Sequence, residues 1–390
     1  MKTGHEFPTA SWDAVGRESA NAELTELLEL VVDKEASDLH LIAGGPPFLR
    51  IHGNLLRLED YPILTPESVW GMIRNILSDR QRERLEQTQE LDLSYSMRGE
   101  ARFRVNVYFQ RDSIGAAFRL IPYEIKSLEE LGLPAQLGDF ARIPRGLVLV
   151  TGPTGSGKST TLASLVDIVN TERYCHIMTV EDPIEFLHHH KRSAVSPREV
   201  GVDTQSFSEA LKHVLRQDPD VILVGEMRDL ETISTAITAA ETGHLVFATL
   251  HTQDAPQTID RIIDVFPPTQ QQQIRVQLST TLQGVMTQQL LPVASGNGRV
   301  VACEILWVTS AVRHLIREGK VHQIYSVMQT GSQHGMQTMD ASVAELVLQG
   351  KVSTQQASEI AHNADELSRL LTAAAPQAAA ASASAARKAI

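Results

Sequence analysis

The chain has 390 residues, with 35 lysines and arginines against 47 aspartates and glutamates, which gives a net charge of −12. This length predicts two or three domains of roughly 100–200 residues each, and a hydrophobic content of 42% excludes wholesale disorder. With only two cysteines, the chain cannot form a disulfide framework or a four-cysteine zinc module. It has no apolar run of about 18 residues, which excludes a transmembrane helix. Its net acidity disfavours a duplex-DNA binder. We therefore expect a cytoplasmic enzyme.

Polar residues without helical periodicity predict a disordered tail over residues 1–21. A small α+β domain is predicted over residues 22–122, beginning with a helix that Asn21 caps and that has an apolar face from Leu24 to Val31. Another helix is expected to begin at Thr65, where a cap residue precedes a proline. Alternating or short apolar runs predict strands at 38–42, 48–52, 55–58, 91–95, 103–109 and 114–121.

Prolines mark residues 123–144 as an interdomain linker, after which an α/β domain is predicted over residues 145–372. Its strands are continuous apolar runs, as is typical of parallel strands that are buried on both faces, and helical stretches separate them. An alanine-rich, disordered tail is expected over residues 373–390. The predicted strands of this domain are 146–151, 176–180, 221–225 and 245–250.

The strongest chemical signal is a phosphate-binding loop that follows the pattern G-x-x-x-x-G-K-[ST] without deviation. It lies between an apolar strand and an amphipathic helix, where glycines let backbone amides close around a polyphosphate. We expect Lys158 to meet the β- and γ-phosphates of ATP and Ser159 to ligate Mg²⁺. The predicted loop consists of Gly152, Pro153, Thr154, Gly155, Ser156, Gly157, Lys158, Ser159 and Thr160.

Glu226 ends an apolar stretch that resembles a Walker B strand, except that Gly225 occupies the place of the usual aspartate. The carboxyl ends of parallel strands are where α/β sheets place their ligands. Glu226 is therefore predicted to act on Mg²⁺, partly through water. The alternative is an acid that only caps the next helix.

Two further clusters flank predicted strands. Glu185 belongs to a group of three carboxylates that follows one strand, and such an acid can orient and deprotonate an attacking water; a solvated loop is the alternative. His244 precedes the strand at 245–250 and His251 follows it. We predict that these histidines contact the nucleotide, although an isolated histidine is more often structural.

Taken together, these sequence motifs resemble those of the secretion ATPase family of type II secretion and type IV pilus motors. Within this family they resemble the pilus retraction ATPases of twitching motility. The resemblance implies a PAS-like N-terminal domain and a RecA-like P-loop ATPase core. It rests on residues 37–41, 46–50, 101–106, 152–160, 180–186, 220–229 and 241–252.

Carried over residue by residue, the resemblance implies that Glu185 is the catalytic glutamate, Glu226 the Walker B acid, and His244 and His251 the His box. It also implies nucleotide-sensing arginines on the polar face of the N-terminal sheet, for which Arg104 and Arg119 are the candidates. A homohexamer is implied, which docks on the inner-membrane platform protein of the pilus machine and so lies against the inner face of the cytoplasmic membrane. A paralogous retraction ATPase is a further implied partner.

The sequence is also compatible with other functions. Within the family, the chain can be an accessory retraction paralogue or an extension motor that lacks zinc. Residues 311–318 resemble a segment linked to retraction, with Val312 and His314 as departures. A RecA-like nucleic-acid translocase is the alternative from another class, which the low aromatic content disfavours because stacking platforms are missing; no nucleic acid is expected as a partner. A nucleotide-binding regulator without turnover is the last alternative.

Overall fold

The computed structural model describes residues 15–51, 53–97, 101–121, 124–296 and 298–373. The chain divides into two compact units, Met1–Glu124 and Ile125–Ile390. Most of the predicted N-terminal tail and all but the first residue of the C-terminal one lie outside the described residues. Helix α1 (Val15–Asp33), however, begins within the predicted N-terminal tail and runs through Asn21, so the predicted cap at Asn21 is wrong.

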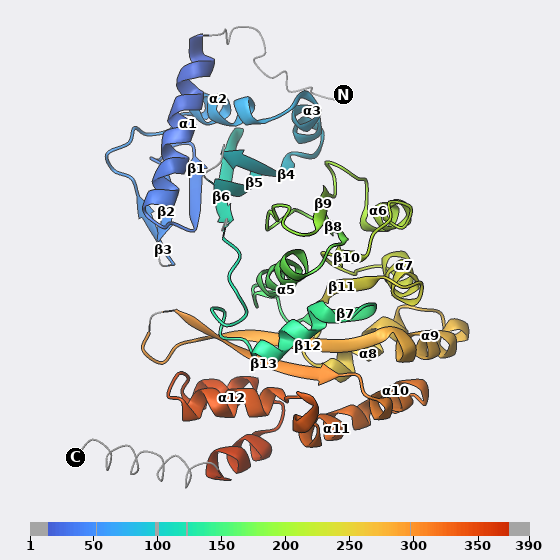
Figure 1. The fold of residues 1–390 in the computed structure, drawn as a ribbon. Coiled ribbons are helices and arrows are strands. Elements are labelled where there is room, and N and C mark those ends of the chain that lie inside the picture. Colours follow the sequence, from blue (N-terminus) through green and yellow to red (C-terminus); the bar gives the residue numbers. More distant parts are fainter. Residues whose placement is uncertain (1–14, 52, 98–100, 122–123, 297, 374–390) are drawn as a thin grey trace, which may run out of the picture. The chain divides into compact units, whose positions relative to one another are not determined.

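The first unit contains, among its described residues, a six-stranded antiparallel sheet with the strand order β3-β2-β1-β6-β5-β4 (Figure 1). Its buried face packs on α1 and α2 (Pro66–Ile76), which begins as predicted because Thr65 caps it in a capping box with Ser68. Helix α3 (Asp79–Thr88), which was not predicted, precedes β4. The strands are β1 (Asp38–Ile42), β2 (Phe48–Ile51), β3 (Asn54–Arg57), β4 (Glu90–Met97), β5 (Ala101–Gln110) and β6 (Ser113–Ile121).

The second unit is built on a seven-stranded sheet with the order β13-β12-β7-β11-β10-β8-β9 in its described part. Neighbouring strands are parallel except β12 and β13, which are antiparallel. The predicted parallel α/β architecture is therefore confirmed, whereas β9, β12 and β13 were not predicted. The strands are β7 (Gly146–Thr151), β8 (His176–Glu181), β9 (Ala194–Glu199), β10 (Val221–Val224), β11 (Leu245–Leu250), β12 (Leu282–Pro292) and β13 (Arg299–Trp307).

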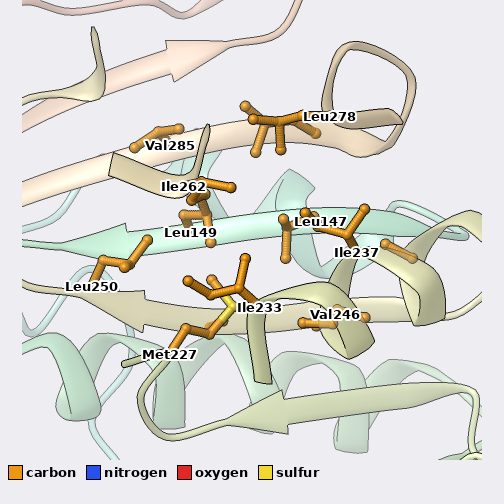
Figure 2. Close-up of a cluster of buried hydrophobic side chains, with 14 of the residues drawn as sticks. Leu147, Leu149, Met227, Ile233, Ile237, Val246, Leu250, Ile262, Leu278 and Val285 are labelled. Carbon is orange, nitrogen blue, oxygen red and sulfur yellow. The ribbon is translucent and has the colours of Figure 1, made fainter. Parts of the chain in front are cut away.

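Helices cover both faces of this sheet, because the strands are apolar on both sides. Alternate residues of β7 face opposite ways: Leu147 and Leu149 pack beneath α7–α9 (Figure 2), whereas Val148 and Val150 pack against α5. The helices are α4 (Asp139–Arg142), α5 (Lys158–Glu172), α6 (Phe207–Val214), α7 (Leu230–Glu241), α8 (Ala255–Asp264), α9 (Pro268–Thr281), α10 (Ser310–Arg317), α11 (Ile324–Thr330), α12 (Met339–Leu348) and α13 (Thr354–Ile360), with short 3₁₀ turns at Ala135–Gly138, Val321–Gln323 and Ser332–His334.

Residues 125–144, which were predicted to form a linker, pack into the second unit. Leu137 and Phe140 are fully buried there, and the Phe140 ring stacks on Trp307 of β13 with 3.9 Å between the ring centroids. These apolar side chains cover the same face of the sheet as α5. The segment is therefore part of the C-terminal core. No helix in the described ranges is both long and apolar enough to cross a membrane.

A fully buried carboxylate, Glu304 of β13, connects this sheet to the start of α8 and faces His362. Its Oε1 accepts a hydrogen bond from the backbone N–H of Ala255, 2.8 Å away at the start of α8. Its Oε2 has no hydrogen-bond partner in the described part of the chain and lies 3.7 Å from Nδ1 of His362. Burial, with the nearby charges of Asp254 and Asp340, raises the pKa of Glu304 to about 7.

We expect the wild-type chain to lose stability as the pH rises from about 5 to about 8, and we expect Glu304→Gln to lack this loss. The pKa rises from 4.5 to about 7 on folding, so the folded chain binds the extra proton between these values. The free energy of unfolding therefore falls as the pH rises through this window, by at most about 3 kcal/mol. Urea unfolding at about pH 5 and about pH 8 measures this difference. Glu345→Gln, on the exposed side of α12, is the control; equal pH dependence in the wild type and Glu304→Gln would contradict the assignment.

Candidate functional site

The predicted phosphate loop joins β7 to α5, and its shape depends on glycine. Gly152, Gly155 and Gly157 have φ values of 135°, 78° and 89°, in the region that other residues rarely adopt. A Cβ atom on Gly152 would lie 2.3 Å from the backbone oxygen of Gln288. Helix α5 begins at Lys158, directly after the last of these glycines. The loop therefore presents backbone amides at the positive end of a helix, an arrangement that suits a polyphosphate.

Lys158 is the first residue of α5 and lies near the two predicted acids, Glu226 and Glu185. Its Nζ donates to the backbone oxygens of Gly152 at 2.9 Å and Pro153 at 3.0 Å. Burial lowers the pKa of Lys158, and the negative charges of Glu226 and Glu185 act to raise it. The ammonium is thus within electrostatic reach of both predicted acids, which come from two different strand ends.

Glu226 follows β10 and is held by two basic side chains. Arg228 binds it with Nε 2.6 Å from Oε1 and Nη2 2.7 Å from Oε2, and Nε2 of His251 is 3.1 Å from Oε1. Burial acts to raise the pKa of Glu226, but the hydrogen bond from Arg228 and the charges of His251 and Arg228 outweigh it, and the pKa is lowered. The structure therefore brings His251 to Glu226 at the sheet edge where the loop lies. The sequence did not predict Arg228 as part of the site. The available signal was its position two residues after the acid Glu226, just beyond a strand.

Ser159, the predicted Mg²⁺ ligand, lines a small cavity of about 30 Å³ beside the loop. Glu181, Gly225 and Thr249, from the ends of three adjacent strands, also line it. A cavity of this size can hold about one water molecule. Its walls include the apolar residues Leu162, Phe186 and Leu223, so only the side of the cavity at the carboxyl ends of the strands offers oxygens next to the phosphate loop.

The structure explains why Gly225 replaces the usual Walker B aspartate. A Cβ atom at this position would lie only 3.2 Å from the backbone of Val180 and Glu181 on β8, and the Gly225 oxygen accepts a 2.5 Å hydrogen bond from Oγ1 of Thr249. A larger side chain would press β10 away from β8. The carboxylate is therefore supplied one residue later, by Glu226.

Glu185 lies in the loop after β8 and is half-buried. Its backbone N–H donates to Oε2 of Glu181 at 3.3 Å, and Oε1 of Glu181 accepts from Oγ1 of Thr179 at 2.8 Å. Glu181 thus holds the start of the segment that carries Glu185 near Lys158.

His244 does not lie at the phosphate loop of its own chain, so the prediction that it contacts a nucleotide bound there is wrong. His244 precedes β11, and its backbone oxygen accepts from the N–H of Gly146, the first residue of β7, at 2.9 Å. The two strands are parallel, so His244 lies at the amino edge of the sheet and the loop at the carboxyl edge, roughly 20 Å away for six residues of strand. Its Nδ1 contacts the oxygen of Ala239 at 2.8 Å, which is a structural role.

The two candidate arginines lie opposite one another in the first unit, Arg104 on β5 and Arg119 on β6. Nε of Arg119 donates to Oδ1 of the buried Asp38 at 2.9 Å, and Nε of Arg104 is 4.0 Å from Oδ1 of Asp92. Burial acts to raise the pKa of Asp38, but hydrogen bonds from Ser37 and Arg119 lower it. Both arginines thus lie on the half-exposed polar face of the sheet, as predicted. Their action on a nucleotide stays a prediction.

Comparison with known proteins shows which family the chain is similar to. The profile of the family described as "Type II/IV secretion system protein" matches residues 13–359. The type IV pilus retraction ATPase PilT of Pseudomonas aeruginosa is 52% identical over 337 residues, which cover 86% of this chain and 97% of that protein. The type IV pilus ATPase PilU of the same bacterium is 41% identical, covering 88% and 90%. A crystal structure of the pilus retraction motor PilT with bound ADP aligns with a TM-score of 0.83 and 49% identity, covering 88% and 98%.

Proposed function

This chain belongs to the Type II/IV secretion system protein family, and we propose that it is an ATP-hydrolysing motor that powers the retraction of type IV pili. One observation carries the proposal: a complete phosphate loop whose Lys158 lies within the field of Glu226 and Glu185, in a chain that matches a pilus retraction ATPase over nearly its whole length.

The residues at the loop fit ATP and Mg²⁺. The amides of residues 152–160 and the Lys158 ammonium would hold the phosphates, and Ser159 would hold Mg²⁺ with Glu226 acting through water. A bound Mg²⁺ supplies positive charge that neutralises the phosphate oxygens. Glu185 accepts a proton from the attacking water, for which it must be ionised and oriented. His251 and Arg228 keep the Glu226 carboxylate oriented. Arg104 and Arg119 are proposed to sense the nucleotide.

The proposal extends to the assembly in which the motor acts. We infer a homohexamer that docks on the inner-membrane platform protein of the pilus machine, on the cytoplasmic side, and that works with a paralogous retraction ATPase. Helix α10 carries the segment linked to retraction. Its Arg313 donates to the oxygens of Ser279 and Thr280 at the end of α9, whereas His314 and Arg317 are exposed. A partner can therefore reach this exposed pair, together with Ala311 and Glu318 at the ends of the segment.

Deleting the gene in its own bacterium is expected to give cells that carry more surface pili than the parent and do not twitch. Fibres would still be extended but no longer withdrawn. Counting pili by electron microscopy and measuring twitching zones tests this, with re-expression of the intact gene as the control. A strain without pili would instead indicate an extension motor, and a strain with unchanged pili and motility would contradict any motor role.

The match to PilU favours one second candidate, an accessory retraction ATPase. The two functions differ in whether this chain suffices alone. Expressed in Pseudomonas aeruginosa that lacks PilT, a main retraction motor restores twitching, whereas an accessory one does not. A nucleic-acid translocase is tested in the same preparations, because its ATP hydrolysis would rise when single-stranded DNA is added.

A further inference from the structure

A polar side chain lies beneath the phosphate loop, inside the apolar interior of the second unit. Gln288 of β12 is only 2% exposed, and buried amides are costly unless they are hydrogen-bonded. Met286 on the same strand is also buried. A methionine or leucine would fill such a position without any need for partners, so the contacts of the amide must explain its presence.

Both ends of the Gln288 amide are engaged by the phosphate loop and its helix. Nε2 donates to the backbone oxygen of Ser156 at 2.6 Å, and Oε1 accepts from Oγ1 of Thr161 at 2.9 Å. Ser156 belongs to the loop and Thr161 to the first turn of α5. One side chain therefore fixes the loop to the helix that it enters.

The backbone of the same strand supports the start of the loop. Parallel pairing places Thr287 opposite Thr151, the last residue of β7, and their hydroxyl oxygens are 2.8 Å apart. Gln288 therefore comes one residue beyond the end of β7, where the loop begins. Its backbone oxygen lies so close to Gly152 that a Cβ atom there would be 2.3 Å away. The register of the sheet thus delivers Gln288 to the loop.

The bond to Ser156 also orients the amide that follows it. In a trans peptide the C=O and the next N–H point in opposite directions. Because the Ser156 oxygen is turned toward Gln288, the N–H of Gly157 points to the other side of the loop, away from the protein core. That outward side is the one from which a phosphate can be bound by loop amides.

We propose that Gln288 is a positioning residue that holds the Ser156–Gly157 peptide of the phosphate loop in the orientation that binds phosphate. This inference rests on the proposed ATPase function and adds to it a residue outside the loop motif. Thr161 orients the amide, and Thr287 fixes the base of the loop. Gln288 touches no reacting atom, so its effect is exerted on nucleotide affinity through the loop.

The test is Gln288→Met in the full-length chain, because methionine keeps the length and volume of glutamine but not its hydrogen bonds. We expect the dissociation constant of a fluorescent ADP analogue and the KM for ATP to rise about tenfold, with a smaller change in kcat. The melting temperature should stay near that of the wild type, because the packing volume is kept. Gln289→Met, on the half-buried neighbouring position, is the matched control and should change neither constant.

A second variant keeps the proposal testable if Gln288→Met does not fold. Thr161→Val removes the hydrogen bond that orients the amide and should raise KM in the same direction by a smaller factor. The effects of the two substitutions should not add, because they remove parts of the same contact. A folded Gln288→Met with unchanged KM and ADP affinity overturns the proposal. A wild-type chain that hydrolyses no ATP contradicts the proposed function instead, and ADP binding still tests Gln288.

Discussion

Replacing Lys158 with alanine is expected to lower the rate of ATP hydrolysis on the order of a thousandfold, as removal of a main electrostatic contact to the reacting group does. The Lys158 ammonium is the cation that the helix start and the nearby acids Glu226 and Glu185 place at the loop. Its own bonds are to the oxygens of Gly152 and Pro153, so its removal should leave the core intact. Steady-state phosphate release at saturating ATP measures the loss, and a thermal melt checks the fold.

Lys212→Ala is the matched control for this substitution. Lys212 forms surface ion pairs with Glu209 and Glu231 on α6 and α7, away from the loop. Its loss should leave phosphate release unchanged, since exposed ion pairs contribute little. If Lys158→Ala hydrolysed ATP at the wild-type rate, the assignment of the site to this loop would be wrong.

The second large effect is expected for Glu226→Gln, which should bind ATP with an affinity within a few-fold of the wild type but hydrolyse it about a hundredfold more slowly. The amide keeps the shape of the carboxylate while removing the charge that Arg228 and His251 bind and that acts on Lys158. Arg228 is mostly exposed, so the loss of its partner should not destabilise the fold. Equilibrium ATP binding and steady-state turnover, measured on the same preparation, separate the two effects.

Glu241→Gln provides the same chemical change at the end of α7, on the exposed surface, and should leave both quantities unaltered. Loss of ATP binding itself in Glu226→Gln would show that this carboxylate maintains the structure of the site. Unchanged turnover would show that the Walker B assignment is wrong.

Strand ends were the part of this site that the sequence predicted best, and the reason is physical. The runs at β7, β8, β10 and β11 are apolar on both faces, so their order along the chain indicates a parallel sheet whose carboxyl ends converge. Glu226 and His251 follow strands and do converge. His244 precedes its strand, and the same geometry places it at the opposite edge. The place of His244 in the His box came from the family resemblance, which takes no account of the direction of the strand.

The polar supports of the site could not be predicted in the same way. Thr287 and Gln288 interrupt the apolar pattern of β12, so the strand has no clear signature. Their role depends on register with β7, which only the fold supplies. Asn21 was misread for a related reason: a good cap residue also occurs inside helices, and the turn that precedes it here is polar. Local patterns identify elements, but tertiary pairing decides which polar residues are used.

The environment of Asp38 has a consequence for the proposed sensing by Arg119. The carboxylate is buried, and within the described part of the chain it lies 2.9 Å from Arg119 and 3.7 Å from Arg50. When Arg119 turns away to another anion, Arg50 still compensates the charge of Asp38. Because Arg50 remains beside the carboxylate, the exchange costs less than the roughly 3–5 kcal/mol of a stranded buried charge. Arg119 can therefore change partners without leaving Asp38 wholly uncompensated.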